Sequence, residues 1–110
     1  MINKTISEIE AKVGAAETVD AERRKELLQL IATLKTEVAE LSKTHQEQAD
    51  SIAEFARVSA HEALRTEQNP QLREISLLGL RSSVEDLEKT HPHLTHLVNR
   101  LSQMLSDWGL

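Results

Sequence analysis

The sequence has 110 residues, with 18 acidic and 13 basic side chains, a formal net charge of -5 and no cysteine. Its length predicts one domain, residues 1–110, with a single core, and the lack of cysteine excludes disulfides, thiolate metal sites and a cysteine nucleophile. The negative charge argues against a nucleic-acid partner. The sequence contains no run of about 18 apolar residues, which a membrane-spanning helix would need. The shortage of aromatic residues and of β-branched stretches predicts an all-α fold.

Apolar residues near the start of the chain recur in steps of four, three and four, which is typical of one face of a helix. They are Ile2, Ile6, Ile9 and Val13. We expect a short amphipathic helix over residues 2–14, which cannot be stable in water without packing on a neighbour. The opening MINKTISEIE lacks the basic and apolar segments of a signal peptide, so we expect a cytoplasmic protein.

A long helix is expected over residues 20–66, with Asp20 as its N-cap. At 1.5 Å per residue it would be about 70 Å long, and such a rod cannot bury its apolar stripe alone. We therefore expect an elongated helical bundle or an antiparallel coiled coil, in which the stripe packs against a second chain. The predicted interface residues are Ile31, Leu34, Val38, Leu41, His45, Gln48, Ile52 and Phe55.

The middle of this stripe is polar and leaves an alternative open. If the helix is continuous, His45 and Gln48 form a buried layer that needs hydrogen-bond partners, because an unsatisfied buried polar group costs about 1 to 3 kcal/mol. Such layers usually set register or oligomer state. The rival is a break near residues 44–51, where Ala49 is the only apolar residue. The lack of glycine and proline in this segment favours a continuous helix.

Two prolines organise the C-terminal part of the chain. Asn69 and Pro70 predict a reversal, because proline disfavours helix in the residue before it and suits the first turn of a new helix. Pro92 predicts a second boundary by the same argument. We expect helices over residues 70–90 and 92–108, which makes four helices in all.

Three C-terminal stretches resemble a known family. They are NPQL at residues 69–72, SSVEDLEKTHPHL at residues 82–94 and the closing LSDWGL. They are similar to the small bacterial proteins grouped as domain of unknown function 4404, which share an HP-x-L turn and a final LS-x-x-G motif. The acid-capped, leucine-rich residues 20–34 are comparable too, whereas the middle, residues 42–67, is longer, and Trp108 stands where the family usually has Asn. The resemblance implies an all-helical bacterial protein and brings no catalytic residue.

A cluster of three histidines is the best candidate for chemistry. His91, His93 and His96 could ligate a divalent ion if all three imidazoles converge. The alternative, which we favour, is a helix start whose histidines cap the turn or face solvent. No nucleophile elbow, phosphate-binding glycine loop or complete zinc-protease motif occurs, so we expect neither an enzyme nor a cofactor.

Two functional classes follow from these observations. The favoured one is a structural or protein–protein interaction module that acts as a homo-oligomer, with a dimer as first choice and an unknown protein partner. The stripes on the long helix and on residues 77–108 offer more apolar length than a few short helices of one chain would cover. The alternative is a metal-binding helical protein that uses the histidines of residues 91–96.

Overall fold

Five α-helices and one short 3₁₀ helix form the described part of the chain, and no residue in that part lies in a strand. The computed structural model describes residues 2–16 and 20–108. The helices are α1 (Ile2–Ala15), α2 (Ala21–Leu41), α3 (Gln46–Leu64), α4 (Pro70–Ser82) and α5 (Pro92–Trp108), with the 3₁₀ helix η1 (Glu85–Leu87) before α5. The prediction of an all-α fold is confirmed, but the expected number of four helices is too low, because residues 20–66 form two helices.

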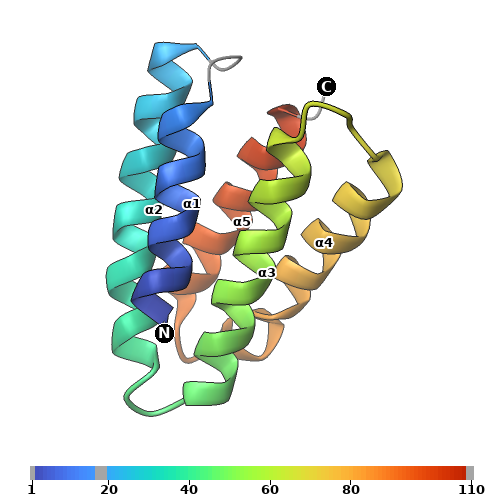
Figure 1. Cartoon of the computed structure of the whole chain (residues 1–110). Helices are drawn as coiled ribbons and strands as arrows, with labels where there is room; N and C mark the ends of the chain where they lie inside the picture. The colour runs from blue at the N-terminus through green and yellow to red at the C-terminus, as the bar shows by residue number, and fades with distance from the viewer. Residues whose placement is uncertain (1, 17–19, 109–110) are drawn as a thin grey trace.

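Consecutive helices run in alternating directions around one core (Figure 1). α1 packs against α2 and α3, α3 packs against α4, and α5 closes the bundle by contacting α2, α3 and α4. The molecule measures 37 × 25 × 22 Å, and its radius of gyration of 12.9 Å is close to the value of about 13 Å for a compact domain of this size. The prediction of an elongated bundle or coiled coil is therefore wrong.

The expected long helix over residues 20–66 is two helices joined by a tight turn at residues 42–45. The hydroxyl of Ser42 donates to the carbonyl of Ala39 at 2.6 Å, and His45 leaves the helical region with φ -136° and ψ 65°. Serine and threonine side chains that bind nearby backbone groups compete with helix propagation. The reversal brings α3 back along α1, so a single chain buries both halves of the stripe.

The buried polar layer predicted at His45 and Gln48 does not form. His45 is exposed at the start of α3, and Gln48 is half-buried. The Thr44 hydroxyl lies 2.8 Å from Nδ1 of His45, so the turn itself supplies a polar partner. Because His45 lies at the surface and Gln48 is only half-buried, neither side chain needs a partner in the core.

Each helix contributes an apolar stripe to one hydrophobic core. In α1 and α2 the stripe consists of large aliphatic residues, including Ile6, Ile9, Ile31 and Leu34. α3 differs, because most of its buried positions are alanines in steps of four, three, four and three: Ala49, Ala53, Ala56, Ala60 and Ala63. Small side chains allow neighbouring helices to approach at the short end of the usual 8 to 10 Å range. α3 can therefore sit at the centre of the bundle.

The C-terminal boundaries follow the caps and prolines. Asn69 caps α4 by accepting a hydrogen bond from the amide of Leu72 at 3.2 Å, and Pro70 occupies the first turn, as predicted. The expected helix over residues 70–90 is too long, because α4 ends at Ser82. There the Ser83 hydroxyl donates to the carbonyl of Leu80 at 2.5 Å, and η1 follows. α5 begins at Pro92, as predicted.

Ser59 of α3 places a hydroxyl group in the hydrophobic core of the bundle. The residue is 0% exposed, and its Oγ has no hydrogen-bond partner among the described residues. Leaving a buried hydroxyl unsatisfied costs about 1 to 3 kcal/mol. We expect Ser59→Ala to raise the free energy of unfolding by about 1 kcal/mol or more, measured by urea denaturation.

The matched control is Ser51→Ala, at an exposed position of the same helix. It gains only the difference in helix propensity, below about 0.7 kcal/mol. A smaller gain for Ser59→Ala than for Ser51→Ala would contradict the assignment of an unsatisfied hydroxyl.

Candidate interaction surface

Four large hydrophobic side chains lie exposed on one side of the bundle. Phe55 of α3 is 41% exposed, and Leu72, Ile75 and Leu78 of α4 are 44%, 66% and 58% exposed. They are the exposed large hydrophobic residues of the described part of the chain, and we call them the α4 face. Single exposed apolar residues are ordinary, but a contiguous patch is typical of an interaction site.

The α4 face arises because α4 is apolar on two opposite sides. Arg73, Ser76, Leu77 and Leu80 are its buried residues. At 100° per residue, the exposed Ile75 points away from Leu80. A helix that only covers a core carries polar residues on its outer side, so the outer apolar residues of α4 need another explanation.

Phe55 joins this surface through a close approach to Gly79. A Cβ atom built on Gly79 would lie 2.6 Å from Cδ1 of Phe55, closer than real Cβ atoms come to a neighbour. The ring therefore covers α4 at the one position that has no side chain. Glycine within a helix costs about 1 kcal/mol of stability relative to alanine. At position 79 it lets the Phe55 ring pack directly on the backbone of α4, beside the apolar side chains of that helix.

A hollow and two charges flank the α4 face. Beside Phe55 and Gly79 lies an open hollow of about 400 Å³. Glu74 and Arg81 lie seven residues apart on α4, so they share one side of the helix. Both are exposed, and neither forms an ion pair or a hydrogen bond that involves another described side chain. Two opposite charges are thus available at the edge of an apolar surface.

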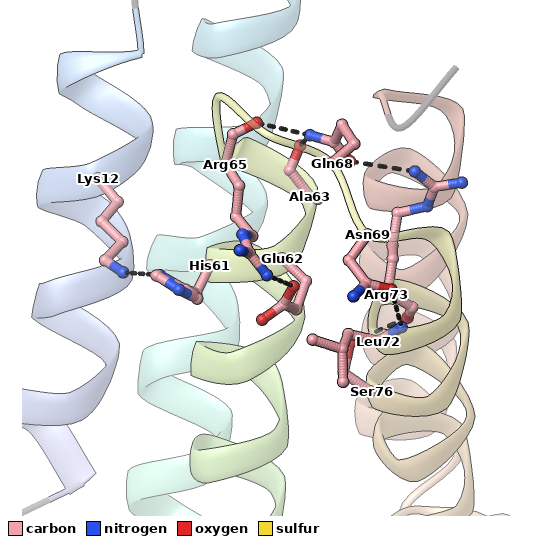
Figure 2. Close-up of polar contacts among 10 residues, drawn as sticks. All are labelled: Lys12, His61, Glu62, Ala63, Arg65, Gln68, Asn69, Leu72, Arg73 and Ser76. Atoms are coloured by element: carbon pink, nitrogen blue, oxygen red, sulfur yellow. Dashed lines mark hydrogen bonds and ion pairs between the residues drawn. The ribbon is translucent and has the colours of Figure 1, made fainter.

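Polar contacts in the α3–α4 connection hold α4 in place (Figure 2). The side-chain amide of Gln68 donates to the carbonyls of Ala63 at 3.1 Å and Arg65 at 2.8 Å. Its oxygen accepts from Nη1 of Arg73 at 3.1 Å. The Ser76 hydroxyl donates to the carbonyl of Arg73 at 2.9 Å. Because the connection is hydrogen-bonded at several points, the outward direction of the α4 face is fixed by the fold.

Two further contacts lie in the same region, one between α1 and α3 and one within the C-terminal turn of α3 (Figure 2). Lys12 of α1 donates to Nδ1 of His61 at 2.7 Å. The mostly buried Glu62 accepts from Nη1 of Arg65 at 2.9 Å. The partly buried geometry of the second pair gives its hydrogen bond more weight than a fully exposed ion pair would have. These contacts belong to the scaffold and leave the α4 face free.

One carboxyl group on α3 has a shifted pKa. The guanidinium of Arg57 donates to Glu54 and lowers the pKa of that carboxyl, while the pKa of Arg57 is raised by the same contact and by Glu8 of α1. The pair stabilises the fold above the usual pKa of a glutamate, and this contribution is lost as the pH falls through the lowered value. Glu54 is exposed and Arg57 is half-buried, so solvent screens the pair and the effect is small.

His91 and His93 line an open hollow of about 510 Å³ beside the C-terminal end of α2. His93 donates from Nδ1 to Glu37 of α2 at 2.8 Å. The rings of His45 and His91 meet edge to face, with centroids 5.7 Å apart. The structure thus brings His45 to a cluster that sequence spacing had assigned to residues 91–96.

Metal binding by this cluster would need at least three converging ligands, which the described residues do not bring together. Among the described residues, no group of three or more His, Asp or Glu side chains is placed to hold a metal ion. His96 is exposed on α5. The pair of His93 with Glu37 instead links α5 to α2, and the contact of His45 with His91 links the α2–α3 turn to the residue before α5.

The residues predicted as an interface fall into two groups. Five of them are buried in the core of the chain itself: Ile31, Leu34, Val38, Leu41 and Ile52. His45 is exposed, Gln48 is half-buried and Phe55 lies on the α4 face. Sequence reasoning missed Leu72, Ile75 and Leu78. The available signal was the apolar content of PQLREISLLGLRS, which exceeds what one buried side of a helix needs.

Comparison with family models, with curated proteins and with solved structures finds no match for this chain. The resemblance to domain of unknown function 4404 and the cytoplasmic location therefore stay predictions. No helix within residues 2–16 and 20–108 is long and apolar enough to cross a membrane.

Proposed function

We propose that the protein is a protein–protein interaction module that acts as a homo-oligomer, with a dimer as its basic unit. The observation that supports this proposal is the α4 face, where the exposed large hydrophobic residues of the described chain gather. Contiguous apolar surface of this kind costs solubility unless it is covered. Covering it by a second copy is the simplest solution, because symmetric dimers are the commonest soluble oligomers.

The residues that support oligomerisation in the structure differ from those that suggest it in the sequence. The stripe of α2 is buried inside one chain, so it leaves no apolar surface for another. The outer side of α4 is the surface that a partner can cover. Its polar neighbours, Glu74 and Arg81, give it the polar rim that interfaces usually have.

Light scattering coupled to size exclusion tests this proposal on the untagged chain. The expected molar mass rises with concentration toward twice the 12.4 kDa of one chain. A contact formed by one short helix from each copy lies at the low end of specific interfaces, near 1,000 Å² in total. The measurement should therefore cover concentrations from about 1 µM to about 500 µM. A monomer over this whole range would refute the proposal.

A further inference from the structure

We infer that the α4 face binds the α4 face of a second copy, with the two α4 helices antiparallel. This inference rests on the proposed function and specifies its surface and geometry. Its first support is the register of α4. Ile75 and Leu78 are spaced as neighbouring a and d positions of a heptad, and the residues on the opposite side of the helix, including Arg73, Leu77 and Leu80, are buried in the chain's own core.

The second support is self-complementarity. In a two-fold symmetric pair, residue i contacts residue j and residue j contacts residue i. Placing Ile75 opposite Leu78 of the second copy satisfies this condition in both directions. The same register sets Leu72 beside Gly79 of the second copy, where the ring of Phe55 and the adjoining hollow can receive a leucine side chain. All four residues of the α4 face are then covered by one contact.

The third support is charge. In an antiparallel pair, the g positions of the two helices flank the apolar seam on the same side. Glu74 and Arg81 both occupy g positions in this register, so each Glu74 meets Arg81 of the second copy, twice per dimer. A parallel pair would instead place Glu74 beside Gly79 and match no charges within α4. Charge pairing thus favours the antiparallel orientation.

The test exchanges these two charges. Glu74→Arg alone and Arg81→Glu alone each place like charges together twice, and we expect the dissociation constant of the dimer to rise at least about tenfold. Mixing the two variants in equal amounts restores opposite charges at both contacts between positions 74 and 81, so the heterodimer should form about as tightly as the wild-type dimer. Ile75→Asp, at the centre of the seam, should raise the dissociation constant at least about tenfold in every mixture.

Two exposed positions away from α4 provide matched controls for net charge. Glu26→Arg on α2 and Arg100→Glu on α5 change the charge by the same amounts and should leave the dissociation constant unchanged. Circular dichroism of each variant checks that the helices remain folded.

The possible failures separate the two proposals. A wild-type dimer that neither charge variant weakens would show that another surface forms the dimer, and it would refute the α4 pairing alone. Weakening of both variants without recovery in the mixture would refute the antiparallel register. A wild-type monomer up to about 500 µM would refute both the pairing and the proposed function.

Discussion

Leu34→Ala is expected to lower the free energy of unfolding by about 2 to 5 kcal/mol, measured by urea denaturation. Leu34 lies on α2 and is fully buried in the core. Truncation loses the transfer free energy of the removed carbons and leaves a cavity that the neighbouring helices fill only in part. Because the core belongs to one chain, the loss relative to wild type should be the same at low and high protein concentration.

Concentration dependence distinguishes this core role from a role in an interface. A residue that packs only between chains affects stability through mass action, so its effect would vary with protein concentration. Thr36→Ala, at an exposed position of the same helix, serves as the control and should change stability by less than about 0.5 kcal/mol. A loss for Leu34→Ala that appears only at high concentration would return Leu34 to the interface first predicted for it.

Local signals account for what the sequence predicts correctly. The starts of α2, α4 and α5 follow from Asp20, Pro70 and Pro92, whose effects act within one helical turn. The Asp20 carboxylate indeed accepts from the amides of Glu22 at 2.9 Å and Arg23 at 3.1 Å. Capping residues and prolines change the backbone where they stand, so no tertiary information is needed to read them.

The turn between α2 and α3 depends on tertiary contacts and could not be read in the same way. Residues 42–45 contain neither glycine nor proline, so local chemistry permits a continuous helix. The turn is favoured because α3 then packs along α1, which buries the stripes of both helices within one molecule. Helix propensity is a weak preference that such packing overrides.

The same limit explains why the interface was predicted along the stripe from Ile31 to Phe55, which the structure divides between α2 and α3. A stripe in steps of three and four is required equally by an intramolecular core and by a seam between chains. Periodicity alone cannot tell whether Val38 or Leu41 meets its own chain or another. The α4 face depends on tertiary packing, because α3 and α5 cover one side of α4 and leave Ile75 and Leu78 exposed on the other.

The alanine stripe of α3 was missed for a different reason. The periodicity of large side chains predicts that Ile52 and Phe55 define the buried side of this helix. In the fold, Phe55 lies at the surface, while five alanines line the core. An alanine contributes little apolar area, but its small size sets how closely α1 and the other neighbours can approach α3.

Ala56→Leu tests this spacing role, and we expect it to lower the free energy of unfolding by about 1 to 3 kcal/mol. Ala56 is 0% exposed at the middle of the stripe. The added carbons must push a neighbouring helix outward or adopt a strained rotamer, since native cores are close-packed. Thermal and urea denaturation should both show the loss.

The control for Ala56→Leu is Ala32→Leu, at an exposed position of α2, which should change stability by less than about 0.5 kcal/mol. The sign of the effect at Ala56 decides between two accounts of α3. If the alanines merely fill space poorly, a larger side chain would bury more apolar area and stabilise the protein. If they set the distance between helices, the same side chain destabilises it, and a measured gain in stability would contradict the spacing role.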